Sequence, residues 1–97
     1  MPSVSVKGTT IAASDACEVV EGNFYFPPSS LQKEYFNPAS SKLTTHCPWK
    51  GDASYYDITV NGEVIPDSAW YYPSAKDKAK NIEGYVAFYK NKVDVKA

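Results

Sequence analysis

Residues that favour turns divide this chain into short segments, and their spacing constrains the fold more than any other feature of the sequence. Glycine, proline and asparagine recur from Gly8 to Gly84, and the apolar segments between them are only a few residues long. Short apolar segments bounded by such residues are typical of a mainly β domain. We expect strands at residues 3–6, 9–13, 17–20, 24–26, 54–60, 69–72, 85–89 and 93–95.

The segment 54–60, SYYDITV, is the clearest of these strands, because its side chains alternate between two faces. The next two residues, Asn61 and Gly62, both tolerate a positive φ angle and therefore predict a type I′ hairpin turn. We expect residues 63–65 to form the partner strand and Pro66 to end it.

Two segments favour short helices. Residues 29–36 follow a double proline and contain a serine and a glutamine spaced as a capping box. In residues 74–84, Ser74 can cap the start and Gly84 can close the end. The apolar side of this second helix is thin and consists of Ala75, Ala79 and Ile82. Because strands outnumber helices, we predict a mainly β fold: a small single domain, residues 1–97, that forms a barrel-like or strongly bent antiparallel sheet with one or two short helices.

The composition argues against several classes of function. The 97 residues carry a net charge of −1 and no arginine, the side chain that best recognises phosphates and guanine edges, so we expect no nucleic-acid partner. No segment approaches an apolar membrane span, and the first residues, MPSVSVKG, lack the apolar centre of a signal peptide. We therefore expect a cytoplasmic protein with no membrane partner, either a monomer or a homodimer formed through an edge strand.

The soft metal ligands of the chain are too few for a structural zinc site. Cys17, His46 and Cys47 are the candidates, and adjacent residues on an extended backbone point to opposite faces. Two cysteines in a reducing compartment remain thiols. The chain contains no phosphate-loop, dinucleotide-binding, zinc-protease or serine-hydrolase motif. We expect no metal site and no cofactor.

The segment THCPWKG, residues 45–51, gathers several chemically distinctive side chains. Cys47 or Lys50 is the candidate nucleophile of an enzyme, with a tyrosine or His46 as proton donor. A thiol needs a base within hydrogen-bond reach, and the proline after Cys47 favours an extended backbone that separates the thiol from His46. We expect a tight turn in which Cys47 and Trp49 close one side of a pocket and Lys50 points into it.

Aromatic side chains provide the second indication of a site. The chain contains eight tyrosines, four phenylalanines and two tryptophans. Tyrosine and tryptophan rings line pockets for sugars, nucleobases and cationic groups, and they also fill small cores. We expect an aromatic-lined pocket where residues 45–55 meet residues 69–73. The candidate ligand-binding residues are Tyr25, Trp49, Lys50, Tyr55, Trp70 and Tyr72.

Three motifs follow one another along the chain. The first, T-x-C-P-W-K-G-x-A-x-Y, spans residues 45–55, with His46 in a variable slot. The second, A-W-x-Y-P, lies at residues 69–73, and the third, I-x-G-Y-V-A-F-Y, lies at residues 82–89. Together they resemble the DUF427 family of small proteins of unknown function, from about residue 21 to residue 94.

The resemblance implies a small, mainly β domain. Proteins of that family are sometimes labelled nucleotidyltransferase-like, a reaction that needs carboxylates to hold Mg²⁺ against the phosphates. The motif positions of this chain are instead aromatic, small or sulfur-containing residues and a lysine. They are Tyr25, Thr45, Cys47, Trp49, Lys50, Gly51, Tyr55, Trp70, Tyr72 and Gly84.

Functions from three classes remain open. The first is a binding module whose aromatic pocket holds a small polar or anionic molecule. The second is an enzyme that uses Cys47 or Lys50 as nucleophile. The third is a structural or protein-interaction domain in which the motifs serve only folding. We favour the binding module.

Overall fold

Three two-residue turns that end in glycine set the local pairing of the strands. In the computed structural model, which describes residues 1–97, the φ angles are 48° and 82° at Lys7–Gly8, 54° and 80° at Glu21–Gly22, and 52° and 80° at Asn61–Gly62. Positive φ at both positions is the mark of a type I′ turn, whose twist matches that of the strands it joins. The predicted hairpin at Asn61–Gly62 is confirmed, and the same geometry recurs at the other two turns.

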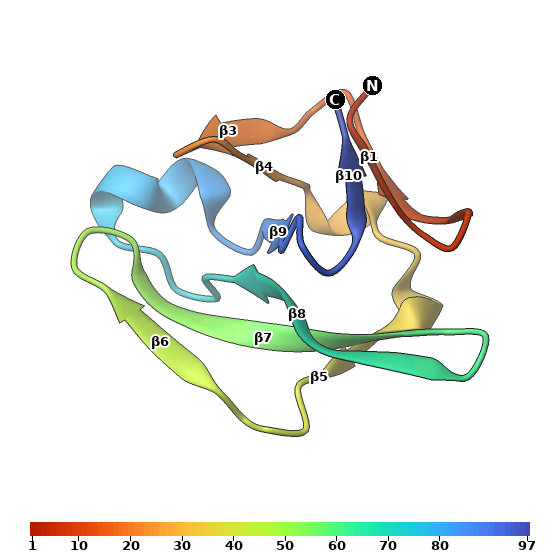
Figure 1. Ribbon diagram of the computed structural model, residues 1–97. Helices are drawn as coiled ribbons and strands as arrows, with labels where there is room; N and C mark the ends of the chain where they lie inside the picture. The colour runs from red at the N-terminus through yellow and green to blue at the C-terminus, as the bar shows by residue number, and fades with distance from the viewer.

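Ten strands carry the fold, and the longest are β7 and β8 (Figure 1). They are β1 (Ser3–Val6), β2 (Thr9–Ala13), β3 (Glu18–Val20), β4 (Asn23–Tyr25), β5 (Phe36–Pro38), β6 (Thr44–Cys47), β7 (Gly51–Val60), β8 (Glu63–Tyr71), β9 (Val86–Phe88) and β10 (Asp94–Lys96). The helical segments are the 3₁₀ turns η1 (Pro28–Ser30), η2 (Lys33–Tyr35) and η3 (Asp77–Ile82). None of them has the length and apolar character needed to span a membrane.

All strand pairs are antiparallel, and the sheets stay open. The largest sheet has the order β5–β7–β8–β9, with β6 paired to β7 next to β5. The strand pair β3–β4 continues this sheet through Phe26 and Val86, whose backbones exchange hydrogen bonds of 2.8 and 2.9 Å. A separate sheet, β10–β1–β2, brings the two ends of the chain side by side (Figure 1). The predicted mainly β fold is confirmed as bent, open sheets rather than a closed barrel.

Alternating side chains of the large sheet enter two separate cores. Val86 and Phe88 of β9 belong to the first core, whereas Ala87 between them belongs to the second. The first core is aliphatic and phenylalanine-rich and lies toward the β10–β1–β2 sheet, which contributes Val4, Val6, Ile11 and Ala12. The second core is built from tyrosines and small residues. Its buried members are Tyr25, Ala39, Ala53, Tyr55, Tyr72, Ala75, Ala79, Ile82 and Ala87.

The helices expected at residues 29–36 and 74–84 are 3₁₀ turns. The expected capping box is absent, because no side chain caps η1, which begins at Pro28. No side chain caps η3, so the expected cap from Ser74 is absent. The carboxylate of Glu83 accepts the backbone N–H of Ala75, which precedes η3, at 2.9 Å. The thin apolar side of this segment does cover the sheet as expected, since Ala75, Ala79 and Ile82 are buried.

Strand β8 continues where the sequence predicts its end. Pro66, Asp67 and Ser68 form a bulge opposite a single residue of β7, Asp57, and pairing resumes at Ala69. A bulge tolerates proline because its residues leave the hydrogen-bond ladder. The strand expected at 54–60 begins earlier, at Gly51, and β5 and β6 lie where the sequence predicts no strand.

The carboxylate of Asp57 holds this bulge together. Its side chain is 6 % exposed and accepts the backbone N–H of Asp67 at 3.0 Å and that of Ser40 at 3.1 Å. The hydrogen bond from Asp67, with that from Ser40, outweighs burial and lowers the pKa of Asp57 below its ordinary value. One buried charge therefore joins β7 to the bulge of β8 and to the loop after β5.

Replacing Asp57 by asparagine is expected to lower the free energy of unfolding by about 1–3 kcal/mol at neutral pH, because the amide nitrogen that replaces one carboxylate oxygen cannot accept an N–H, and one of the two hydrogen bonds is lost with the charge. The lowered pKa means that this stabilisation is complete above the unfolded aspartate pKa of about 3.9 and is lost as pH falls through the folded value. Urea denaturation at several pH values checks this, and the gap between the two proteins should narrow in acid.

The matched control is Asp52→Asn, on the same strand but 78 % exposed, which should change stability by less than about 1 kcal/mol. Equal losses for the two variants, or a gap that does not depend on pH, would contradict the role assigned to Asp57.

Candidate functional site

The turn between β6 and β7 places Pro48, Trp49 and Lys50 outside the strand ladder. Cys47 pairs with Gly51 across this turn, and Gly51 has a φ of 111°, a region that favours glycine. A Cβ atom at Gly51 would lie 3.1 Å from the carbonyl oxygen of Ser74, so the turn packs tightly against the segment before η3. The tight turn predicted for this segment is confirmed.

Lys50 is a buried lysine at the end of that turn. Its side chain is 8 % exposed, and its ammonium forms a salt bridge with Glu21, from the β3–β4 turn. The same nitrogen lies 5.2 Å from the centre of the Trp49 ring and 5.6 Å from that of Tyr72, within the range of cation–π contacts.

The surroundings of Lys50 keep its amine protonated. Burial by itself lowers the pKa of Lys50, but the hydrogen bond to Glu21 and the nearby Tyr25 and Tyr72 outweigh it, so the net shift is upward. A nucleophilic lysine needs the opposite, a lowered pKa that frees the lone pair. This geometry does not favour Lys50 as a nucleophile.

Cys47 and His46 lie on opposite faces of β6, as the alternation of a strand requires. The Cys47 side chain packs against the second core, and no hydrogen bond joins its thiol to a base. The exposed His46 contacts the carboxylate of Asp52 on β7, with Nδ1 and Oδ1 2.7 Å apart. The structure therefore does not bring the thiol and the imidazole together.

Aromatic residues form a continuous cluster next to Lys50. The Trp70 indole N–H donates to the Tyr25 hydroxyl at 3.2 Å, and the Trp70 and Tyr89 rings lie 4.7 Å apart between centres. Tyr89 in turn stacks parallel to Tyr55, which shares a 3.0 Å hydrogen bond with Thr45. These contacts belong to the second core, and of the four rings only that of Tyr55 borders a pocket.

Burial and the hydrogen bond from Tyr89 to the hydroxyl of Tyr55, 3.4 Å long, raise the pKa of Tyr89 to about 12. Burial also raises the pKa of Tyr72, although the Lys50 ammonium opposes that shift. Both phenols are therefore neutral hydrogen-bonding groups near physiological pH.

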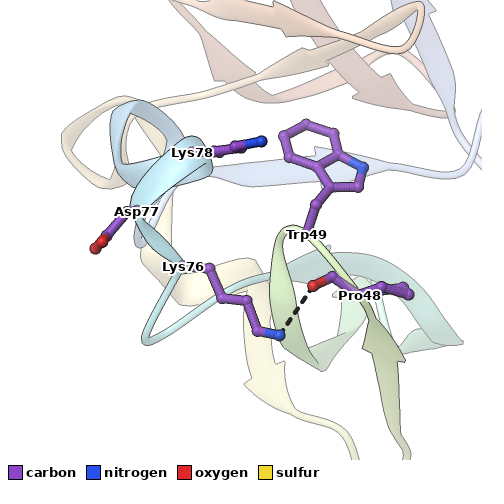
Figure 2. A pocket seen from close by; sticks show the side chains of 5 residues that line it. All are labelled: Pro48, Trp49, Lys76, Asp77 and Lys78. Carbon is purple, nitrogen blue, oxygen red and sulfur yellow. Dashed lines mark hydrogen bonds between the residues drawn. The ribbon is translucent and has the colours of Figure 1, made fainter.

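Trp49 is the exception among these aromatic residues, because 37 % of it is exposed. It borders a pocket of about 490 Å³, shown in Figure 2. The lining residues are Pro48, Trp49, Lys76, Asp77 and Lys78. In Figure 2 the amine of Lys78 extends toward the indole, while the carboxylate of Asp77 points away. The amine of Lys76 donates to the carbonyl oxygen of Pro48 at 2.8 Å and so ties the turn to the start of η3.

A second pocket, of about 370 Å³, lies where the β6–β7 turn meets residues 73–76. No tyrosine, tryptophan or phenylalanine lines it. Its lining residues are His46, Gly51, Asp52, Pro73, Ser74 and Lys76. Lys76 is common to this pocket and to the one beside Trp49.

The six residues expected to bind a ligand therefore do not line one common pocket. Tyr25, Lys50 and Tyr72 lie together inside the protein, with Trp70 joined to them through Tyr25. Of the six, only Trp49 borders the pocket of Figure 2. Tyr55 borders a different pocket, near Leu43.

Sequence reasoning misses Glu21, Lys76 and Lys78. Glu21 belongs to a glycine turn, the visible signal, but nothing in the sequence gives its partner 29 residues away. The two lysines occur in a lysine-rich run that a solvated surface explains equally well.

The fold and these sites define a small, mainly β domain with a tyrosine-rich second core and a buried lysine. The family model described as a domain of unknown function, DUF427, matches residues 2–97. The chain belongs to the DUF427 family, and the match extends beyond the residues 21–94 expected from the motifs. A search of curated proteins found no match to the chain.

Lys50 should be the lysine that amine reagents modify most slowly. Its amine is buried and protonated, whereas Lys78 is exposed. Acetylation with acetic anhydride at alkaline pH, followed by peptide mass spectrometry, gives the rate at each of the ten lysines. If Lys50 reacts as fast as Lys78, its amine is accessible and the argument against a nucleophilic role is lost.

Tyr89 should ionise at a pH of about 12, later than a free tyrosine. Because the unfolded phenol loses its proton near a pKa of about 10, the stability of the folded state should fall as pH rises from about 10 to about 12. Tyr89→Phe should remove the late step from an absorbance titration and reduce the alkaline loss of stability. An unchanged titration curve in this variant would contradict the assignment.

Proposed function

We propose that this protein binds a small anionic molecule that carries a planar ring, in the pocket beside Trp49. The observation that supports this most directly is the combination of a partly exposed indole with two lysines, Lys76 and Lys78, in one pocket. An indole face offers a surface for stacking, and the amines favour a negative group at the rim. The volume, about 490 Å³, lies within the usual range for small-molecule sites.

The pocket is built from two segments that fix each other. Trp49 stands on the β6–β7 turn, and the lysines lie at the start of η3. The backbone N–H of Lys76 donates to the carbonyl oxygen of Lys50 at 3.0 Å, and the Lys76 amine binds the carbonyl oxygen of Pro48. These bonds hold the residues that line the pocket in place before a ligand binds. Binding then costs little conformational entropy, which supports the proposal.

The enzyme alternative has less support. Cys47 has no base in contact, and the amine of Lys50 is held in its protonated form. Asp77, the one carboxylate of the Trp49 pocket, points away from it in Figure 2. A binding role requires none of these groups to react.

A thermal-shift screen with aromatic carboxylates and nucleoside monophosphates, and with neutral sugars for comparison, tests the proposal. Trp49→Ala should weaken binding of a hit about tenfold or more, since stacking on an aromatic side chain contributes about 1–3 kcal/mol. Lys78→Ala should weaken it about two- to fivefold, and less at high salt. Lys78 is the cleaner lysine variant because Lys76 also holds the turn.

Trp70→Phe and Lys96→Ala are the matched controls, because neither residue borders the pocket. Both should leave the affinity unchanged. A hit whose affinity falls equally in Trp70→Phe, or a screen in which no ring-bearing anion shifts the melting temperature, would contradict the proposal.

A further inference from the structure

The ammonium of Lys50 has a single ionic partner, and the two ends of this ion pair differ greatly in exposure. The Lys50 side chain is 8 % exposed, whereas that of Glu21 is 56 % exposed. The rings of Trp49 and Tyr72 and the carboxylate of Glu21 stand around the nitrogen, and Tyr25 lies nearby. The Lys50 ammonium thus lies inside the protein, while the Glu21 carboxylate that pairs with it comes from an exposed side chain.

A buried ammonium requires an anion, but nothing in this arrangement requires that the anion be Glu21. Removing a charged group from water is costly unless a partner of opposite sign is present. Any carboxylate that reaches the same position supplies the same charge and the same acceptor oxygen. The released Glu21 side chain would return to water, where its own charge is readily solvated.

The backbone around Glu21 favours movement of its side chain alone. Glu21 and Gly22 form a two-residue turn, and the amine of Lys90 donates to the carbonyl oxygen of Gly22 at 2.8 Å. The β3–β4 ladder on either side is intact, with Val20 paired to Asn23. Exchange of one anion for another therefore needs a rotation of the Glu21 side chain and no unfolding of the hairpin.

We infer that the Lys50 ammonium is a binding site for a small carboxylate, and that Glu21 occupies this site when no ligand is bound. Because the rings of Trp49 and Tyr72 already lie 5.2 and 5.6 Å from the nitrogen, we expect a slim group such as a terminal carboxylate to bind there. Glu21 then acts as an internal competitor that sets the affinity.

This inference goes beyond the function proposed above. Lys50 does not border the pocket of Figure 2, and the two sites share only the Trp49 ring. Acetate carries no ring, and only the part of its effect that requires Lys50 reports the Lys50 site. A negative result for the Lys50 site therefore does not contradict the proposed ligand pocket beside Trp49, and the reverse also holds.

The test compares the melting temperature of the protein and of Glu21→Gln in sodium acetate, in sodium chloride of equal ionic strength, and in acetamide. Glu21→Gln keeps the shape of the side chain but removes the competing charge. It should melt at a lower temperature than the parent protein, and acetate should restore at least half of the loss. The parent protein should need at least about tenfold more acetate for a comparable response, which corresponds to about 1.4 kcal/mol of competition.

Two matched variants separate a site from a general salt effect. Glu63→Gln removes the carboxylate of the exposed Lys7–Glu63 pair and should show no acetate-specific rescue. Lys50→Met in the Glu21→Gln background should abolish the rescue, because it removes the cation. The indole N–H resonance of Trp49, assigned through Trp49→Phe, should shift on acetate addition only when Lys50 is present.

The inference is overturned if acetate and chloride raise the melting temperature of Glu21→Gln equally, or if acetamide does so as well. Equal rescue of Glu63→Gln or of the Lys50→Met double variant also overturns it. If Glu21→Gln does not fold, the indole resonance of the parent protein decides: no shift in concentrated acetate rejects the site.

Discussion

Burial of the Lys50 ammonium imposes requirements on three segments at once. A charge that is removed from water must be balanced nearby, and here the balance comes from a carboxylate on one turn and two aromatic rings. The β3–β4 turn must therefore reach the β6–β7 turn, and Tyr72 must lie beneath it. The carbonyl oxygen of Lys50 also accepts the backbone N–H of Lys76, which places η3. This one cation therefore links the β3–β4 turn, the β6–β7 turn and Tyr72 of the second core.

The large sheet separates that polar arrangement from the aliphatic core. Alternation along β9 sends Val86 and Phe88 to one face and Ala87 to the other, and the small side chain of Ala87 leaves room for aromatic rings. Trp70 pairs with Ala87 across the ladder, so a large side chain lies opposite a small one. The bulge at Asp57 then lets β8 pass a proline without ending the sheet. The first core thus stabilises the fold, and the second core positions the site.

Much of the fold could be predicted from local signals, because hairpin turns and short strands are encoded by neighbouring residues. The pair Asn61–Gly62 is enough to predict the turn between β7 and β8. Gly8 and Gly22 end turns of the same kind and so limit the length of the strands beside them. Pro66 shows the limit of local reasoning: proline normally ends a strand, and only Asp57, nine residues earlier, accounts for the bulge that accommodates it. The site was harder to predict. A lysine next to tryptophan and glycine is recognisable as unusual, but its burial and its bond to Glu21 depend on contacts between distant segments.

An exposed lysine, Lys78, and a buried one, Lys50, both lie beside Trp49. Salt in the solution affects their electrostatic interactions differently. Lys78 is exposed, so its attraction for an anion acts over a distance but weakens as salt screens it. The charge of Lys50 is buried between rings, where salt screens it little and where the carboxylate of Glu21 already pairs with it. An exposed amine can therefore pair with any anion in solution, whereas another anion can pair with the buried amine only by displacing Glu21. Under the two proposals above, a molecule with a ring and a terminal carboxylate is the ligand that would meet both kinds of lysine, with its ring on the indole of Trp49.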